Sequence, residues 1–449
     1  MTIFGAYDVR GVYPKDINPH LAEKIGLTFP DVVSTKKILV GYDARKTSPK
    51  LFNALVSGLK KRGMQIFTIG LCSKPQFFFS AFFYEFDAGI YITASHNPSQ
   101  YNGFKFVGKN GIQMGYDQGL EKLEQLINRG NWHESLHEGL VVKFDTGIDY
   151  DMFLEKYIIP NKELKIVIDS LNGTGSRAAK LLANYTNATL LNNTPNGNFP
   201  KKNPNPTVAE VRKPLEQKVK QTKAAIGIAF DGDADRVVFV NEKGKVVPPD
   251  FILALLIDHL GEKGDRVVVD ALLSKVVDEE CKKNKIKVYR SKVGTSYIIQ
   301  NMKRKRARFG AEWSGHFYFE DLNHSDSGVL CAIHVLNIMK VTQQKLSDLI
   351  KPYERYIISE MRNFEVDDKQ AVIDMVNEDF KGKKDRLDGL SVETDTYKFN
   401  IRPSNTEPLL RCRIEGKKQD EMNRVLREID IIVANVNKGV KKNNGKKKK

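Results

Sequence analysis

The chain has 449 residues, of which 41% are hydrophobic and 28% charged, proportions that exclude a disordered or fibrous protein. Its length allows about two to four domains. The formal net charge is +16, and seven of the lysines fall within residues 438–449, which leaves +9 for the rest of the chain. Such a charge favours anionic partners, phosphorylated metabolites included, and does not by itself require nucleic acid.

The cysteines and the apolar runs indicate the compartment. Cys72, Cys281, Cys331 and Cys412 are far apart in the sequence and form no C-x-x-C pair, so we expect a reducing compartment, the cytoplasm. Residues 1–14 contain no basic stretch followed by an apolar one, and no run approaches 18 apolar residues. We therefore expect neither a signal peptide nor a membrane span.

A strand–helix–strand pattern occurs three times along the chain. A continuous apolar run followed by an amphipathic helix is typical of a sheet that helices cover. The three repeats predict three α/β units in series. Their predicted elements are 37–43, 49–62 and 64–69; 164–169, 176–185 and 188–191; and 266–270, 274–284 and 286–289.

The last part of the chain differs, because short strands are predicted at 357–366, 390–392, 396–401 and 409–414, followed by a helix from 419 to about 435. This order predicts a small α+β domain. Residues 192–206, rich in Asn and Pro, are expected to form a long surface loop. The predicted divisions are 1–147, 148–248, 249–353 and 354–436, with 437–449 as a disordered lysine-rich tail.

The first segment that carries chemistry surrounds Ser95. An apolar strand ends there, and a loop begins that Pro98 limits. A serine exposed at the end of a strand can act as a nucleophile or carry a phosphoryl group, although a serine in a loop is usually a turn residue. His96 is adjacent, but neighbours on extended chain point to opposite faces, which disfavours a serine-hydrolase pair.

The second segment is an acidic turn after a buried-type strand. Asp231, Asp233 and Asp235 alternate, so on extended chain they share one face and repel one another unless a cation lies among them. Carboxylate oxygens suit Mg²⁺ or Ca²⁺. Glu242 stands at the twelfth position of an EF-hand loop, but Arg236 stands where that loop needs Gly, and a strand follows where it needs a helix. We therefore reject the EF-hand.

The third and fourth segments carry polar groups that suit a phosphorylated sugar. Glu312, Ser314 and His316 alternate and could bind sugar hydroxyls, but a satisfied turn is an equal alternative. The loop 402–408 and the arginines that follow it offer guanidinium groups, hydroxyls and an amide that can wrap a phosphate, against the alternative of a polar turn. Its candidate residues are Arg402, Ser404, Asn405, Thr406 and Arg411.

One motif is interpreted as structural. Residues 173–178 match G-x-G-x-x-A between a strand and a helix, as dinucleotide sites do. The acidic residue expected at the end of the next strand is missing, so a tight strand-to-helix turn is the better interpretation.

Together the four segments resemble the α-D-phosphohexomutase superfamily, most closely its bacterial phosphomannomutase/phosphoglucomutase branch. The resemblance extends from the Tyr-Asp-Val-Arg-Gly motif at residues 7–11 to about Asn435. It implies three α/β domains with mixed sheets and a C-terminal α+β domain around a central cleft. The implied activity is an intramolecular phosphotransfer between hexose 1-phosphate and hexose 6-phosphate, of mannose and/or glucose, through a phosphoserine and a hexose 1,6-bisphosphate that also serves as activator.

The resemblance also implies roles for single residues. Ser95 would carry the phosphoryl group and, with Asp231, Asp233 and Asp235, bind Mg²⁺. Glu312 and Ser314 would hold sugar hydroxyls, and the loop 402–406 the phosphate that does not react. The other residues implied at the reaction centre are Tyr7, Arg10, His96, Lys105, Arg236 and His316. Among them, Lys105 and His316 are candidates for proton transfer or charge stabilisation.

Two departures from the branch bear on the sugar. A Lys is frequent there where Leu272 stands, and a His where Thr295 stands, and bulky Trp313 adjoins Glu312. Phosphoglucosamine mutase is therefore the alternative activity, although Asn405 stands where that enzyme usually has Gly.

A basic nucleic-acid-binding protein is a more distant alternative, because the basic residues form no known module, and a non-enzymatic carbohydrate-binding protein leaves the three aspartates without a task. We expect a phosphosugar as substrate, no specific nucleic acid, and a monomer or dimer.

Overall fold

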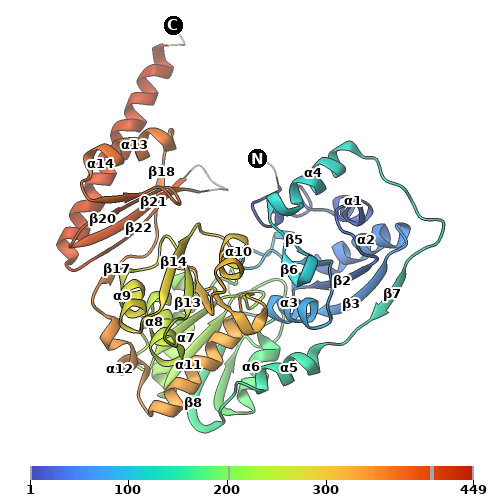
Figure 1. Ribbon diagram of the computed structural model, residues 1–449, viewed down its shortest axis with the longest axis horizontal. Coiled ribbons are helices and arrows are strands. Elements are labelled where there is room, and N and C mark those ends of the chain that lie inside the picture. The colour runs from blue at the N-terminus through green and yellow to red at the C-terminus, as the bar shows by residue number, and fades with distance from the viewer. Residues whose placement is uncertain (1–2, 201–202, 405–408, 447–449) are drawn as a thin grey trace.

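The structure is a computed structural model that describes residues 3–200, 203–404 and 409–446, with side chains as far as Lys438. Its strands form four separate sheets in chain order. Figure 1 shows the first unit in blue to cyan, the fourth in red, and the second and third, green to orange, between them. Among the described residues, no helix combines the length and the apolar character needed to cross a membrane.

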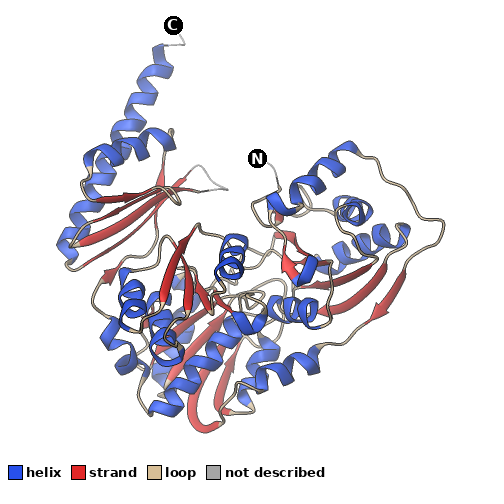
Figure 2. Cartoon of the chain, in the orientation of Figure 1, coloured by secondary structure: helices blue, strands red, loops and turns tan. Residues whose placement is uncertain are grey.

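The first unit is a mixed sheet of order β1-β5-β4-β2-β3-β7, with β6 paired to β5. Side chains alternate between its faces, so that Ile38 and Val40 of β2 join the core under α1, α2 and α4, while Leu39 joins that under α3. Figure 2 shows these helices on the two faces. The elements are β1 (Val9–Val12), α1 (Pro19–Thr28), β2 (Lys37–Tyr42), α2 (Ser48–Lys61), β3 (Gln65–Leu71), α3 (Lys74–Phe83), β4 (Gly89–Ile92), β5 (Tyr101–Gly108), β6 (Ile112–Gln113), α4 (Leu120–Arg129) and β7 (Leu140–Lys143).

The second unit has the sheet order β12-β11-β10-β8-β9, parallel from β10 to β9 and antiparallel at β11 and β12. The predicted surface loop falls between β9 and α7, where the described residues form neither helix nor strand. The elements are α5 (Gly147–Glu155), β8 (Asn161–Asp169), α6 (Ser176–Ala183), β9 (Thr186–Leu191), α7 (Ala209–Thr222), β10 (Ile226–Phe230), β11 (Val237–Asn241) and β12 (Val246–Val247).

The third unit has the order β14-β13-β15-β16, with only β16 antiparallel. The second and third units share one hydrophobic core, to which the apolar helices α8 and α11 contribute most of their length. The second and third units are therefore held together by a shared core and not only by the segment that connects them. The elements are α8 (Pro249–Leu260), β13 (Arg266–Asp270), α9 (Lys275–Lys283), β14 (Lys287–Ser291), α10 (Thr295–Lys305), β15 (Phe309–Ala311), β16 (Phe317–Phe319), α11 (Gly328–Thr342) and α12 (Leu346–Ile350).

The fourth unit is an antiparallel sheet of order β17-β22-β21-β20-β19, with β18 paired to β22 and its own core against α13 and α14. A buried ion pair joins it to the third unit, because Arg413 donates to Asp250 at 3.0 and 2.6 Å. The elements are β17 (Ile357–Ile358), β18 (Arg362–Glu365), α13 (Lys369–Asp379), β19 (Lys383–Asp385), β20 (Leu390–Glu393), β21 (Tyr397–Pro403), β22 (Leu409–Gly416) and α14 (Gln419–Lys446).

The predicted fold class, three α/β units with mixed sheets followed by an α+β unit, is confirmed, and each predicted strand–helix–strand repeat is a parallel pair joined by a helix. One prediction is wrong in detail, because the strand expected at 357–366 is two strands, β17 and β18. Helix α14 continues to Lys446, and the disordered tail expected from residue 437 stays a prediction.

Candidate active site

The first unit presents Ser95 in a strained loop directly after β4. Its φ is +49°, in the left-handed region that non-glycine residues rarely adopt. The backbone N–H of Ser95 donates to the Thr93 hydroxyl at 2.8 Å, and its hydroxyl donates to Asp231 Oδ2 at 3.1 Å. The expectation that Ser95 and His96 point apart is wrong: Oγ lies 3.3 Å from Nδ1 of His96, because the loop is not extended.

The loop of residues 93–101, called the serine loop below, is held by a residue that the sequence analysis missed. The guanidinium of Arg45, fully buried, donates to four backbone carbonyls of this loop, those of Ser95, Asn97, Pro98 and Tyr101, at 2.7–3.0 Å. Its Nε pairs with Asp43 at 3.0 Å. Asp43 ends the first predicted strand, and this position at a strand's carboxyl end was the available signal.

The second unit supplies the metal turn, residues 231–236 between β10 and β11. It is a tight turn with Ala234 at φ +63°, so the prediction that its aspartates share a face of extended chain is wrong. Asp231, Asp233 and Asp235 meet nonetheless, fully buried, with ligand oxygens within 4.8 Å of one another. The EF-hand stays excluded, since Glu242 instead accepts a hydrogen bond from the backbone of Ser347.

The electrostatics of the metal turn call for a cation. Burial and the neighbouring carboxylates raise the pKa of Asp231 well above its ordinary value, and the pKa of Asp233 to about 6. Although burial acts in the same direction on Asp235, Lys74 and His316 hold its pKa well below the ordinary value. Oδ1 of Asp233 and Oδ1 of Asp235 have no hydrogen-bond partner among the described residues. Buried oxygens left without partners fit the requirements of a divalent cation.

Basic side chains surround this carboxylate group. Lys105 of β5 is buried, with Nζ 3.7 Å from Asp235 Oδ2. Arg10 of β1 pairs with Asp8 and donates to Asn97 at 2.7 Å, and its Nε has no hydrogen-bond partner among the described residues. Arg236 lies with Nε 3.8 Å from Asp231 Oδ2. The centre can therefore balance the charge of a phosphoryl group from several sides.

The third unit contributes the turn between β15 and β16. The alternating residues of this segment lie on a turn and not on extended chain, since Gly315 has φ +88°. The turn brings Nδ1 of His316 to 3.0 Å from Glu312 and 2.8 Å from the Ser314 hydroxyl. Glu312 also accepts from Gly294 N–H at 2.7 Å and from Tyr318 at 2.6 Å. Although burial opposes it, these contacts lower the pKa of Glu312 to about 2.

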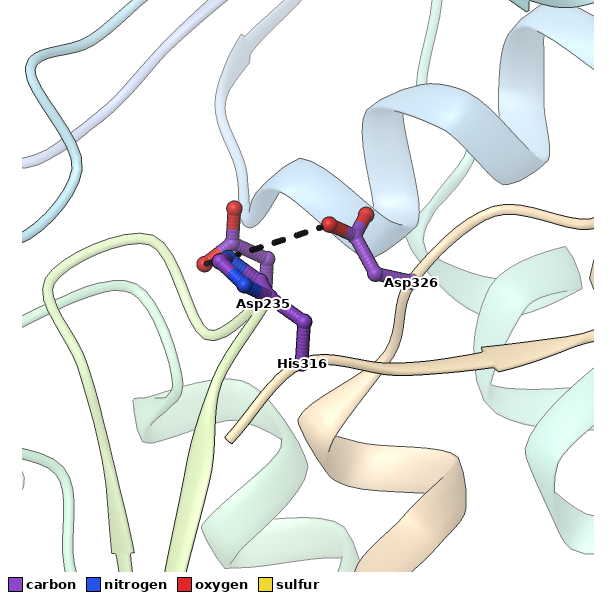
Figure 3. A group of neighbouring side chains, drawn as sticks. All are labelled: Asp235, His316 and Asp326. Carbon is purple, nitrogen blue, oxygen red and sulfur yellow. Dashed lines mark ion pairs between the residues drawn. The ribbon is translucent and has the colours of Figure 1, made fainter. Parts of the chain in front are cut away.

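His316 connects the third unit to the metal turn. Arg236 donates to its Nε2 at 3.1 Å, and the same nitrogen lies 3.5 Å from Asp235 Oδ1. Burial and Arg236 lower the pKa of His316, but the carboxylates outweigh them and raise it above the ordinary value. Figure 3 shows His316 directed at Asp235 and at Asp326, a residue from the loop before α11 that the sequence analysis missed.

The fourth unit reaches this centre through an intermediary. Arg402 and Arg411 stand opposite each other on β21 and β22, an arrangement of like charges that favours an anion nearby. Asp388, also missed, accepts from Arg402 at 3.2 Å and from Val293 N–H of the third unit at 2.9 Å. Ser404 is buried. Asn405 and Thr406 lie outside the described residues.

The structure thus brings the first three segments into direct contact. The fourth unit contacts residues 293–294 of the third unit, where the N–H of Val293 donates to Asp388 and the N–H of Gly294 donates to Glu312. Tyr7 joins them from the first unit, because a side chain on Gly294 would lie 3.2 Å from its ring. Four units in this order, with a buried serine beside three aspartates, define an α/β enzyme with a carboxylate centre between its first three units.

Comparisons with known proteins identify this class. Four domain families of phosphoglucomutase/phosphomannomutase match this chain in order. They are alpha/beta/alpha domain I over residues 1–134, domain II over 150–244, domain III over 248–356, and the C-terminal domain over 361–432. A phosphomannomutase from Methanocaldococcus jannaschii is 33% identical over 97% of this chain and 98% of its own length. A phosphoglucosamine mutase from Ruminiclostridium cellulolyticum is 33% identical over 96% and 98%.

A solved structure agrees with these relatives. A phosphoglucomutase/phosphomannomutase family protein from Burkholderia thailandensis superposes with a TM-score of 0.88 at 26% identity, covering 97% of this chain and 98% of the other. The chain belongs to the phosphoglucomutase/phosphomannomutase family, and it is a phosphohexomutase, an isomerase of hexose phosphates. The resemblance inferred from four sequence segments is confirmed.

Proposed function

We propose that this phosphohexomutase interconverts the 1- and 6-phosphates of mannose and/or glucose through a phosphorylated Ser95 and a hexose 1,6-bisphosphate. The observation that carries the proposal is the buried contact of 3.1 Å between Ser95 Oγ and Asp231, beside two aspartates that each hold an oxygen without a hydrogen-bond partner among the described residues. A hydroxyl in this position suits a phosphoryl carrier whose charge the centre is built to balance.

The donor set fits Mg²⁺, because all the candidate ligand atoms are oxygens and two of them are buried without partners. Asp231, Asp233, Asp235 and Ser95 would hold the ion. When bound, magnesium supplies positive charge to the phosphoryl oxygens. The remaining roles belong to the chain itself.

The chemistry consists of two opposite transfers. In the first, the bond between phosphorus and Ser95 Oγ breaks as a bond to a sugar hydroxyl forms, and the hydroxyl proton passes to a basic group of the site. The bisphosphate then turns around, and its other phosphate returns to Ser95. Lys105 and His316 both lie within 3.7 Å of Asp235 and serve as candidates for moving the proton or offsetting charge. Positioning and charge balance are the main requirements of phosphoryl transfer.

The sugar has to be held in either orientation. We assign its hydroxyls to Glu312 and Ser314, and its outer phosphate to Arg402, Arg411 and Ser404, together with Asn405 and Thr406. Since either end of the sugar must fit the same phosphate loop, that loop is the fixed anchor. Tyr7, Arg10, His96 and Arg236 line the reaction centre in this proposal. A hexose 1,6-bisphosphate would activate the enzyme by phosphorylating Ser95.

Phosphoglucosamine mutase stays the second candidate, because a relative of that name is as similar to this chain as the phosphomannomutase reported above. Leu272 is buried, and Thr295 accepts from Tyr318 at 3.2 Å within the protein, so neither position offers the sugar a charged group. A coupled assay of mannose, glucose and glucosamine phosphates, with the bisphosphate present, decides between them.

Two measurements test the mechanism. Intact mass of the wild type should show a fraction heavier by one phosphoryl group, which Ser95→Ala lacks and the control Ser57→Ala on α2 retains. An unmodified wild type that stays inactive with added hexose bisphosphate contradicts the proposal. A chelator should abolish activity and Mg²⁺ restore it, whereas activity that ignores the chelator removes the metal assignment.

The remaining expectations concern partners and place. All four cysteines are buried free thiols, as a reducing cytoplasm favours. We expect a monomer or dimer without specific nucleic-acid binding. Truncation before Lys438 should leave mutase activity intact and remove any salt-sensitive RNA binding.

A further inference from the structure

A lysine that no sequence motif indicated lies in the centre of the molecule. Lys74 is the first residue of α3, and its side chain is fully buried. Its Nζ donates to Asp326 at 2.6 and 2.7 Å and to Asp235 Oδ2 at 3.0 Å. Three units of the fold therefore meet at one ammonium group.

The two oxygens of Asp235 are treated differently by their surroundings. Oδ2 is taken by Lys74 at 3.0 Å, with Lys105 at 3.7 Å. Oδ1 has no hydrogen-bond partner among the described residues, although His316 Nε2 lies 3.5 Å from it, and it is the oxygen left to face a metal ion. Lys74 thus fixes which oxygen of Asp235 remains available to a metal ion.

The same residues form a second group with the composition of a metal site. One ligand atom each from Asp235, His316 and Asp326 lies within 4.8 Å of the others, and all three residues are buried. Figure 3 shows their side chains converging from the metal turn, the start of β16 and the loop before α11. Two buried carboxylates at this distance require positive charge. Lys74 contacts both at 3.0 and 2.6 Å, closer than His316 at 3.5 and 3.9 Å.

The position of Lys74 is unfavourable in every respect except these contacts. The first turn of a helix disfavours a cation, and burying an ammonium group is costly unless it is well paired. The contacts of its Nζ with Asp326 and Asp235 supply that pairing. Its backbone N–H also donates to the Asp233 carbonyl at 2.9 Å, which anchors the start of α3 on the metal turn.

We propose that Lys74 is a built-in cation that occupies the Asp235–His316–Asp326 group in place of a second metal ion and positions Asp235 for the single ion of the metal turn. The inference rests on the proposed magnesium site. It assigns Lys74 and Asp326 as positioning residues, with no step of bond making or breaking. Removing the ammonium should open a second site for a divalent cation.

Counting bound ions tests this directly. Purified protein is dialysed against Mn²⁺, and bound manganese per chain is measured by elemental analysis and by electron paramagnetic resonance. We expect one ion in the wild type, two in Lys74→Met, and one again in Lys74→Met/Asp326→Asn, which removes a ligand of the new site. The matched control is Lys283→Met, because Lys283 also contacts two carboxylates, Asp258 and Glu280, but its own side chain is exposed; this variant should bind one ion.

Several results overturn the inference: two ions in the wild type, one in Lys74→Met, or two in the double variant. If Lys74→Met is too unstable to dialyse, its melting temperature is compared with and without Mn²⁺. We expect stabilisation by the ion well beyond that of the wild type, and an equal effect in both proteins contradicts the proposal. None of these ion counts depends on turnover. If the protein has no mutase activity but the wild type, Lys74→Met and the double variant bind one, two and one ions, the proposed function is contradicted and this inference stands.

Discussion

A Cβ atom at position 232 would lie 2.6 Å from the carbonyl oxygen of Ser95, closer than real Cβ contacts. Gly232 is therefore where the metal turn touches the serine loop. Neither side can easily yield, because the carbonyl of Gly232 accepts from Thr174 N–H at 3.0 Å and the carbonyl of Ser95 accepts from buried Arg45. The approach of serine to aspartate thus depends on the absence of one side chain.

Gly232→Ala should separate the two segments. We expect overpacking to cost about 1–3 kcal/mol of unfolding free energy, and kcat to fall roughly a hundredfold, since a displacement near 1 Å has that effect on positioned groups. Denaturant unfolding and the coupled mutase assay measure both. Gly130→Ala serves as control for turnover. A side chain there meets open space, but φ is +66°, so we expect a loss of stability from backbone strain with wild-type turnover. Wild-type turnover in Gly232→Ala would contradict the argument.

Arg45 is the second determinant of the serine loop. Arg45→Met leaves the buried Asp43 carboxylate unpaired and four loop carbonyls without their donor. The unfolding free energy should drop by about 3–5 kcal/mol, as for other buried pairs that lose one partner, and Ser95 should no longer be phosphorylated by hexose bisphosphate. The readouts are chemical denaturation and intact mass.

The control for Arg45 is a pair at the surface. Arg177 contacts Asp151 at 2.7 Å with nearly half of its side chain exposed, and Arg177→Met should cost at most about 1 kcal/mol. Equal losses in the two variants would show that the pairing of Arg45 has no special importance.

The sequence was sufficient for the elements whose pattern is local. The run of apolar residues at 266–270 is β13 as predicted, and the helix that follows differs from its prediction by one residue at each end. Likewise the three aspartates, Ser95 and His316 could be chosen as candidates because each lies in a short motif. Periodicity and motif spacing are properties of a few consecutive residues, so a single sequence displays them.

What the sequence did not reveal depends on distant partners and on backbone twist. Lys74 and Asp326 are 252 positions apart, and nothing beside Lys74 in the chain marks it as buried. The turn containing Ala234 was expected to be extended, because a positive φ at a residue other than glycine cannot be inferred from its side chain. The candidate residues thus lie together in the structure, but with a local geometry that differs from the expected one.

His334 of α11 should control part of the acid stability. It packs against the rings of Phe319 and Tyr157 with centroids 5.3 and 5.8 Å away. Burial and, to a lesser degree, Arg308 lower its pKa to about 4. Because an unfolded histidine binds a proton near pH 6.5, the stability that this group contributes is present above that pH and is lost as pH falls toward 4.

His334→Phe should remove this loss while keeping an aromatic ring. Between pH 7 and pH 4.5, the unfolding free energy of the variant should gain about 2 kcal/mol relative to the wild type, measured by urea unfolding at each pH. The exposed His133, changed to Gln, should leave the difference at zero. A pH dependence unchanged in His334→Phe would mean that another group governs acid unfolding.

Asp388 should determine how firmly the fourth unit holds the guanidinium of Arg402 in position for the substrate's phosphate. Its carboxylate joins Arg402 at 3.2 Å to the Val293 N–H at 2.9 Å, so Asp388→Ala frees the guanidinium and cuts one link to the third unit. Losing one charged hydrogen bond, worth about 1.5–3 kcal/mol, should raise KM for hexose phosphate roughly tenfold or more, with kcat at saturation nearly unchanged. Initial rates over a range of substrate concentrations separate the two constants. Asp374→Asn, on the exposed side of α13, should alter neither. A fall in kcat without a change in KM would place Asp388 in the chemical step and contradict its role as a positioning residue.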